Sequence, residues 1–566
     1  MPPKRKRNGA ERMKKRKQTE NDGQNGEDQR DNHDDSKLLE ALSADDKDEK
    51  QTENGQLAEG TSDHIFESND VRKDTSKNTS KDEIYLENQL VEGENSATVE
   101  NAANNMEFAQ FENVLPKSIH PESKSFSSLY LETIDRKRLD FDFEKLCSVS
   151  LSSTNVYACL TCGKYFQGRG KKSYAYLHSV DFDHHVFINL STKRVYVLPE
   201  GYEVTNNSLN DIKYVLDPEY DRKYVFSIDK IPQESFDLDH RPYKPGFVGL
   251  NNLRENSYAN VAMQALAHIS PLRNFLMLES FSSSPELVKR FSTLVKKIWN
   301  PRAFQAHVSP HELLQFLSIT SNNKFTTTTG KDPFDFLMYL VNELHLALGG
   351  TRKPQSSIIQ KILQGKIRVE SQALISWQGE DSRREFSAST ETETKIIPFM
   401  FLNLELPTSP LFQGKIEKNA IPQVHLTTLL NKYDGLTSQE LPGHSRRYKI
   451  VELPRVLIVH VKRLNRSSLV ERHNPTVVNF SANNLDMAPY VEGATEPIYY
   501  NLIANIIYEE GSASEVGTAT KERWKIQLLE KSRSEWKELE DLVVESVPKE
   551  LLFLRESYIQ VWEAAK

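Results

Sequence analysis

Four residues with the spacing of a zinc site constrain the fold of this chain more than any other feature. Cys159 and Cys162 form a Cys-x2-Cys pair; His178 follows Cys162 after fifteen intervening residues, and His184 after five more. A Cys-x2-Cys turn brings two thiolates to one ion, and two imidazoles complete a tetrahedral zinc site. We therefore expect a small module folded around structural zinc, with no open catalytic position.

Two details of this zinc site stay open. His185 is adjacent to His184 and could replace it as a ligand. The remaining cysteine, Cys147 in FEKLCSVSL, is expected to be a buried structural residue. The alternative interpretation is that Cys159 and Cys162 are core thiols and the histidines lie on the surface. Three cysteines are too few for a disulfide framework, which indicates a reducing compartment.

Residues 1–110 have the composition of a disordered tail. They are rich in Asn, Asp, Glu, Lys and Ser and nearly free of aromatic residues, so they cannot bury enough apolar surface to offset chain entropy. The basic clusters PPKRKR and RMKKRK, within residues 2–17, predict a bipartite nuclear-import signal. The alternative is a solvated charged tail with weak RNA contact.

Folded composition begins near Phe126 and falls into two parts. Residues 126–235 are rich in aromatic residues and hold every cysteine, and a linker with scattered prolines follows. Residues 246–566 have the composition and length of one large mixed globule. No apolar run approaches the roughly 20 residues that span a bilayer, so we expect no membrane segment. The net charge of −8 argues against a globally basic nucleic-acid coat.

The first part resembles the zinc finger of ubiquitin-specific proteases, the UBP-type finger. The similar stretches are CGKYFQGRG, AYLHSVDFDHH and HVFINLSTKRVYVL. Later cysteines that many such fingers carry are absent, so the resemblance implies a single zinc ion. Fingers that bind ubiquitin use an arginine after Cys-Gly, where this chain has Lys164. Lysine lacks the planar fork that grips a carboxylate, which weakens the case for ubiquitin binding.

The second part resembles the catalytic domain of the same proteases. The matching boxes appear in the family's order: GLNNLRENSYAN, GKDPFDFLMYLVNEL, LPRVLIVHVKRL, YYNLIANIIY, EWKELEDLVV and SYIQVWEA. The resemblance implies an α+β, papain-like fold with thumb, palm and fingers. The fingers of this family usually bind zinc through two Cys-x-x-Cys pairs, which this chain lacks, so we expect packing alone to hold them.

The nucleophile and oxyanion positions of the resemblance do not hold catalytic residues. Ser257 stands where the family has its cysteine nucleophile, and no cysteine occurs after Cys162. Glu255 stands where the family has its oxyanion asparagine, and an ionised carboxylate would repel a developing oxyanion. Serine also has a structural explanation, because it is a good helix N-cap and Val261, Ala265 and Ile269 would share one helix face.

The histidine that would act as the catalytic base is also missing. The last histidine of the chain is His473, and the family's histidine position, beyond it, falls at or near Arg523, which stays protonated. Only Asp541 matches the third member of the triad. His460, in the central strand box, is interpreted as a structural strand histidine. We therefore predict a protein that keeps the fold and has lost the reaction; a hydrolase that uses Ser257 is a remote alternative.

The combination of finger, degenerate protease domain and basic tail resembles a splicing-associated branch of this family. Additional matching stretches are FDFEKLCSVSLSSTNVYACL, KIWNPRAFQAHVSPHELLQ and NPTVVNF. The resemblance implies a nuclear, non-catalytic pre-mRNA splicing factor that helps to assemble or maintain the U4/U6.U5 tri-snRNP. It implies protein partners in that particle, including its helicase, while RNA contact through the tail stays open. The alternative function is a ubiquitin reader without protease activity.

Overall fold

The computed structural model describes residues 130–378, 384–407, 422–441, 443–465, 472–510 and 522–565. All of them belong to one compact unit that extends to the C-terminal end of the chain. The expected tail, residues 1–110, and its basic clusters lie outside the described residues. Among the helices that are described, none combines the length and the apolar character needed to cross a bilayer.

The N-terminal module is a five-stranded antiparallel sheet with a helix on each face. Its strands are β1 (Val156–Cys159), β2 (Tyr165–Gln167), β3 (Val186–Asn189), β4 (Val195–Val197) and β5 (Tyr202–Val204), in the order β2-β1-β3-β4-β5. Side chains alternate along β1, so Val156 and Ala158 join one buried cluster while Tyr157 and Cys159 join another. Helix α2 (Asn210–Leu216) covers the first cluster, and α1 (Tyr174–Phe182) covers the second.

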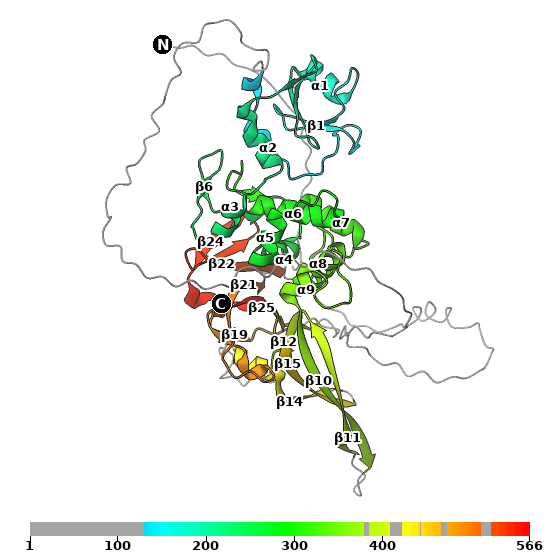
Figure 1. The fold of residues 1–566 in the computed structure, drawn as a ribbon, viewed down its shortest axis with the longest axis vertical. Helices are drawn as coiled ribbons and strands as arrows, with labels where there is room; N and C mark the ends of the chain where they lie inside the picture. The colour runs from blue at the N-terminus through cyan, green and yellow to red at the C-terminus, as the bar shows by residue number, and fades with distance from the viewer. Residues whose placement is uncertain are drawn as a thin grey trace, which may run out of the picture. The chain divides into compact units, whose positions relative to one another are not determined.

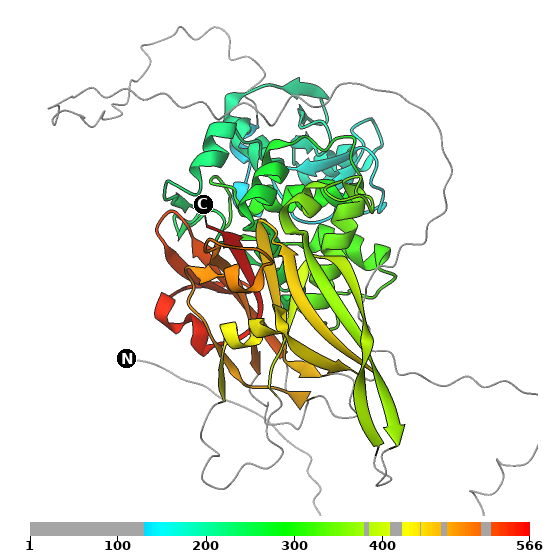
Figure 2. The ribbon, with the colours of Figure 1, turned by 60° about the horizontal axis from the view of Figure 1, so that its bottom comes forward.

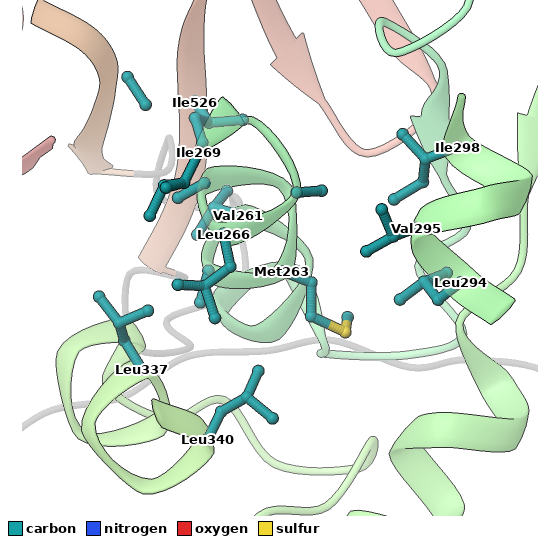
Figure 3. Close-up of a cluster of buried hydrophobic side chains, with 14 of the residues drawn as sticks. Val261, Met263, Leu266, Ile269, Leu294, Val295, Ile298, Leu337, Leu340 and Ile526 are labelled. Carbon is teal, nitrogen blue, oxygen red and sulfur yellow. The ribbon is translucent and has the colours of Figure 1, made fainter. Parts of the chain in front are cut away.

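Helices form one layer of the large domain (Figure 1). They are α3 (Arg222–Ser227), α4 (Ser257–Ala267), α5 (Ser270–Leu278), α6 (Glu286–Ile298), α7 (His311–Thr320), α8 (Pro333–Ala347) and α9 (Ile358–Leu363). Helix α4 is central: every residue from Tyr258 to Ala267 is buried. Figure 3 shows side chains of α4, α6, α8 and β22 converging around it. Val261, Ala265 and Ile269, expected on one face, are all buried, and so are the residues between them, because neighbours enclose the helix on all sides.

A mixed sheet lies against these helices. Its order is β12 (Phe401–Glu405), β16 (Val456–Lys462), β25 (Glu556–Ala564), β21 (Tyr499–Glu510), β22 (Glu522–Glu530), β23 (Glu535–Glu540) and β24 (Val543–Val547), with β20 (Leu485–Asp486) also paired to β21. Alternation divides β22 between two cores: Ile526 and Leu528 join the helical core, and Leu529 packs against the core on the opposite face. The sheet thus separates two hydrophobic cores.

A second sheet forms the finger-like ribbon, with strands β10 (Gly365–Gln378), β11 (Arg384–Phe399), β14 (Asp434–Leu441) and β15 (His444–Glu452) in the order β11-β10-β15-β14. Figures 1 and 2 show β10 and β11 extending away from the helices. Helices, central sheet and ribbon confirm the expected α+β class. Short elements complete the fold: β6 (Ser235–Phe236), β7 (Pro242–Tyr243), β8 (Gly249–Leu250), β9 (His307–Val308), β13 (Gln423–His425), α10 (Leu426–Leu430), β17 (Leu464–Asn465), β18 (Arg472–His473) and β19 (Val477–Asn479).

The two folded parts share packing across their junction. Val225 and Ile228, on and just after α3, lie in the core of the large domain, whereas Phe304 of the large domain lies in the core of the small module. Lys297 donates to the Asp142 carboxylate at 2.8 Å, and that carboxylate also accepts from the Ser309 amide at 2.7 Å. The junction is therefore a packed interface within one compact unit, held also by the hydrogen bonds of Asp142 to Lys297 and Ser309.

Candidate metal centre and degenerate active site

The structure brings the four predicted metal ligands together. Cys159 ends β1, Cys162 lies in the turn that follows, His178 is on α1, and His184 comes just after that helix. Their sulfur and ring-nitrogen atoms all lie within 4.8 Å of one another. Cys162 Sγ is 3.4 Å from His178 Nε2, and Cys159 Sγ is 3.6 Å from His184 Nδ1. In the described part of the chain, these four residues form the only group of this kind.

Gly163, directly after Cys162, closes the turn that holds both cysteines. Its backbone has φ +76°, and its amide donates to the Cys159 carbonyl at 2.9 Å. A Cβ at this position would lie 2.2 Å from the Arg138 carbonyl oxygen, so the close approach excludes any side chain. Glycine after Cys162 therefore allows the tight turn that directs both sulfur atoms to one point.

The surroundings of the cluster suit a bound cation. The hydrogen bond between the two thiols lowers the pKa of Cys162 and raises the pKa of Cys159, and burial lowers the pKa of His178. A thiolate and a neutral imidazole are the forms that coordinate metal. Phe166 stacks on His178 with ring centroids 4.2 Å apart, which fixes the ring. Two sulfurs and two nitrogens match tetrahedral zinc, whose ligand bonds of roughly 2.0–2.3 Å require this spacing.

The structure shows which of the adjacent histidines, His184 or His185, belongs to the metal cluster. His185 Nδ1 lies 2.8 Å from the Leu198 carbonyl, Nε2 lies 2.8 Å from Asp183 Oδ1, and the ring stacks on Tyr130. Both of its nitrogens are thus engaged outside the cluster. Cys147 is fully buried and accepts a weak hydrogen bond from the Ser150 amide, also outside the cluster. The expected structural position of Cys147 agrees with this burial.

Ser257 lies at the start of α4, as predicted, but it does not cap the helix. Helix α4 begins at Ser257, and the N-cap position belongs to Asn256, which is fully buried. Asn256 Oδ1 accepts from the Leu253 amide at 2.7 Å, and its Nδ2 donates to Asn260 Oδ1 at 3.0 Å. The N-cap interpretation of Ser257 is therefore wrong by one residue, because the asparagine side chain already organises this turn.

Glu255 holds a neighbouring loop against the nucleophile box. Its amide donates to the Thr327 carbonyl at 2.9 Å, and its Oε2 accepts from the Gly330 amide at 3.1 Å. The Tyr258 hydroxyl donates to the Thr326 carbonyl at 2.9 Å. The position expected to supply an oxyanion donor instead presents an acceptor that binds the segment 326–330.

Arg523 and Asp541 face different partners. Arg523 lies on β22 with a side chain 56% exposed, and its Nη1 is 3.8 Å from Glu540 Oε1. The Asp541 carboxylate accepts from Asn252 Nδ2 at 2.8 Å and from Asn260 Nδ2 at 3.2 Å. Arg523 therefore belongs to a surface ion pair, whereas Asp541 fixes the chain around α4. Their assignment to the degenerate triad positions stays a prediction.

His460 lies on β16 in a buried aromatic site. Its ring stacks on Phe334 with centroids 3.7 Å apart, and its Nδ1 is 3.0 Å from Asn403 Oδ1. Burial lowers the pKa of His460 to about 3, and the Lys462 charge acts in the same direction. Such an imidazole stays neutral at physiological pH and packs as a ring. These contacts agree with the structural role expected from the sequence.

Two features of this site were not predicted from the sequence. One is Glu540, the ion-pair partner of Arg523; the other is the amide network around Asp541 and Asn256. The repeated asparagines of GLNNLRENSYAN carried a signal for that network. Glu540 ends β23 and Asp541 begins the turn after it with φ +49°, so the two adjacent carboxylates face different partners, which the sequence alone does not show.

A Cys/His finger joined to a papain-like domain with a nucleophile box defines the class of ubiquitin-hydrolase-type proteins. The chain belongs to the ubiquitin carboxyl-terminal hydrolase family, whose model matches residues 248–562. A second family model, "Zn-finger in ubiquitin-hydrolases and other protein", matches residues 147–209. This finger family binds zinc, and the Cys/His cluster lies within the matched range.

Relatives match most of the chain. It is 43% identical over 446 residues to "Probable mRNA-splicing protein ubp10" of Schizosaccharomyces pombe, with 77% of this chain and 88% of the relative covered. It is 41% identical to human "Ubiquitin carboxyl-terminal hydrolase 39", with 77% and 79% covered. A solved structure described as "Crystal structure of an essential yeast splicing factor" has a TM-score of 0.64 and 32% identity, with 77% and 100% covered.

Proposed function

We propose that this protein is a nuclear pre-mRNA splicing factor that acts as a non-catalytic protein scaffold. The similarity to splicing proteins over both the finger and the large domain carries this proposal. The alignments cover 88% and 100% of those proteins, so the likeness is not confined to one module. A papain-like domain without catalysis still offers broad surfaces to protein partners.

The lack of catalysis rests on three positions of the nucleophile and histidine boxes. Ser257 has replaced the family's cysteine, Arg523 occupies the histidine position, and Glu255 presents an acceptor to the segment 326–330. A serine nucleophile needs a base to remove its proton and donors to stabilise the oxyanion. Arg523 can supply neither a lone pair nor a change of charge at neutral pH.

One structural zinc ion completes the finger in this proposal, held by Cys159, Cys162, His178 and His184. The spacing of these atoms and the S2N2 donor set support a single ion. The finger extends over residues 126–235 and the degenerate protease domain over residues 246–566. A tail with a bipartite nuclear-import signal, residues 1–110, precedes them.

The particle in which this scaffold works is the U4/U6.U5 tri-snRNP, and its partners are proteins of that particle, including the helicase. The support is the resemblance of the whole folded region to the splicing-associated branch of the family. The test is affinity capture of the tagged full chain from nuclear extract at moderate salt, followed by probing for U4, U5 and U6 RNA. Recovery of all three supports the assignment, and recovery of none contradicts it.

The loss of catalysis has a separate test. The purified full chain is incubated with a fluorogenic ubiquitin C-terminal amide, beside Ser257→Ala as a matched control. We expect both proteins to show the background rate of the substrate. Turnover by the natural chain that disappears in Ser257→Ala would contradict the proposal and favour a serine hydrolase.

A further inference from the structure

Strand β24 forms one edge of the central sheet, and in the described part of the chain no strand lies beyond it. The opposite edge is covered, because β12 contacts α10 and the Tyr433 hydroxyl donates to the Asn403 carbonyl of β12 at 2.9 Å. Strand β24 pairs with β23 without a bulge and contains neither lysine nor proline, which commonly protect sheet edges. This edge is therefore open to a further strand.

The turn between β23 and β24 determines which backbone groups of β24 face the open edge. Two residues lie between the strands, so Glu540 and Val543 form the hydrogen-bonded pair that closes a two-residue hairpin. Directly opposed residues of an antiparallel ladder alternate between hydrogen-bonded and non-hydrogen-bonded pairs. Val544 and Ser546 belong to the non-hydrogen-bonded pairs, so their amides and carbonyls point away from β23.

Apolar side chains lie exposed along the first part of this edge. Leu542, at the end of the turn, is 51% exposed, and Val543 and Val544 are 53% and 38% exposed. Neighbouring side chains of a strand point to opposite faces of the sheet, so Val543 and Val544 leave apolar surface on both faces. A strand added beside β24 would cover part of this surface on each face.

Glu545 gives the same edge a negative charge. It lies directly opposite Glu538 in the strand register, where like charges repel. Lys525 is 3.9 Å from Glu538, and it also contacts Glu509 and Glu540, at 2.6 Å and 3.1 Å. Among the described residues no cation forms an ion pair with Glu545, which is exposed. A lysine or arginine opposite Glu545 on an added strand would offset this charge.

This charge also disfavours a second copy of the chain as the added strand. Glu545 is the middle residue of β24 (Val543–Val547). Antiparallel pairing of two β24 strands about a twofold axis would therefore place the two Glu545 side chains opposite each other, and like charges in that position are destabilising. A different protein that carries a basic residue at this position avoids the repulsion. The charge of the edge thus favours a partner protein over a second copy.

We propose that β24 accepts an extended segment of a partner protein as an additional strand of the central sheet. The segment forms main-chain hydrogen bonds with Val544 and Ser546 and covers Val543 and Val544 with apolar side chains. It places a lysine or arginine opposite Glu545. Main-chain hydrogen bonds supply affinity in this kind of recognition, and alternate side chains supply specificity. The inference rests on the proposed scaffold function, because it assigns this edge to a protein of the splicing particle.

Photo-cross-linking of the tagged full chain in nuclear extract tests this proposal. Val543→p-benzoylphenylalanine places the probe on the edge, and the same replacement at Tyr499, which is 43% exposed at the start of β21, serves as control. Mass spectrometry locates the cross-linked segment, in which we expect alternating apolar residues and a lysine or arginine. Adding Val544→Pro removes an outward amide and should lower the yield about tenfold, whereas Val544→Thr keeps that amide and most of the yield.

Two further measurements separate strand pairing from loss of the fold. Proline is tolerated where the amide faces away from the ladder, so urea unfolding of Val544→Pro should match that of the natural chain. Glu545→Lys leaves the backbone unchanged and should also lower the cross-link yield. Replacing the basic residue of the identified segment with glutamate should then restore the yield, because the two charges are exchanged.

Equal yields for Val544→Pro and Val544→Thr, or no restoration by the charge exchange, would overturn the proposal. Cross-links within one chain, or between isotope-labelled and unlabelled copies, would do the same. Absence of a cross-link at position 543 while U4, U5 and U6 RNA are still recovered would overturn the strand pairing alone. Recovery of none of these RNAs would contradict the proposed function, and with it the strand pairing that rests on it.

Discussion

The metal centre depends on individual atoms that neighbouring residues cannot replace. His184 belongs to the cluster because its Nδ1 lies 3.0 Å from His178 Nε2, while the adjacent His185 uses both ring nitrogens elsewhere. Cys147 and Cys159 are both fully buried, yet only Cys159 joins the cluster. These two pairs provide matched controls for the predicted zinc ligands.

We predict that Cys159→Ala and His184→Ala lose bound zinc, whereas Cys147→Ala and His185→Ala keep it. Binding free energy at a structural zinc site is also folding free energy, so the two ligand variants should unfold at lower temperature. The measurement is zinc content per chain by elemental analysis after gel filtration. Full zinc in Cys159→Ala, or loss in His185→Ala alone, would contradict the ligand assignment.

A buried neutral histidine gives a prediction for pH. The pKa of His460 is lowered to about 3 by burial, against an ordinary value of about 6.5. Between these values the unfolded chain binds a proton that the folded chain does not. The free energy of unfolding should therefore fall as pH drops below about 6.5, by up to about 1.4 kcal/mol per pH unit from this residue.

Urea unfolding of the natural chain and His460→Gln, between pH 7 and pH 4, measures this contribution. Glutamine keeps a donor for Asn403 and cannot titrate, so the slope with pH should flatten. Burial also lowers the pKa of His268, to about 4, so part of the slope should remain. His425→Gln is the control, because His425 is exposed. An unchanged slope in His460→Gln would refute the assignment.

At the scale of residues, the sequence predicted the features that depend on local spacing and missed those that depend on strand pairing. The Cys-x2-Cys pair and the box around Ser257 are local patterns, so the sequence located the cluster and the start of α4. The choice between His184 and His185 depends on which side of a turn each ring faces. The partner of Arg523 depends on strand pairing between β22 and β23. Neither property is encoded in the identity of the residue alone.

At the scale of elements, the matched boxes predicted strands and helices better than periodicity did. The box LPRVLIVHVKRL contains β16, and GKDPFDFLMYLVNEL contains most of α8. Helix α4 shows the limit of periodicity: Val261 and Ala265 are buried, but so are their neighbours, because a helix enclosed by α5, α8 and the sheet has no polar face to mark its orientation. The polar residues Asn256, Asn260 and Gln264 are tolerated there because each makes internal hydrogen bonds.

The junction between finger and large domain gives a prediction about elements. Asp142 and Lys297 are 17% and 11% exposed, and Asp142 also holds the Ser309 amide. Asp142→Ala leaves the Ser309 amide without an acceptor and leaves the mostly buried Lys297 ammonium with the Phe141 carbonyl but no carboxylate, which should lower the free energy of unfolding by about 3 kcal/mol. Asp142→Asn keeps an acceptor oxygen and should lose less.

Urea unfolding and limited proteolysis of the segment 228–246 measure this effect. We expect faster cleavage of that segment in Asp142→Ala, because the junction no longer holds the two parts together. Asp239→Ala removes an exposed pair with Lys137, 46% and 66% exposed, and should leave both measurements nearly unchanged. Equal stability and equal cleavage rates of Asp142→Ala and Asp239→Ala would show that the interactions of Asp142 with Lys297 and Ser309 do not stabilise the junction.

At the scale of the whole molecule, the chain keeps the architecture of a ubiquitin hydrolase, while the positions that we assign to a degenerate active site contact other parts of the domain. Glu255 binds the segment 326–330, and Arg523 pairs with Glu540. The sequence predicted this class because the boxes occur in order over the whole large domain. It could not predict these contacts, since they join residues that are not neighbours in the chain.

The most direct measurement of the central claim is depletion and replacement in splicing-competent nuclear extract. Depletion of the protein should reduce the level of U4/U6.U5 tri-snRNP and the splicing of a reporter pre-mRNA. The account predicts that the natural chain and Ser257→Ala restore both to the same extent, because no reaction at position 257 is needed. Unimpaired splicing after depletion, or failure of Ser257→Ala alone to restore it, would contradict a non-catalytic splicing scaffold.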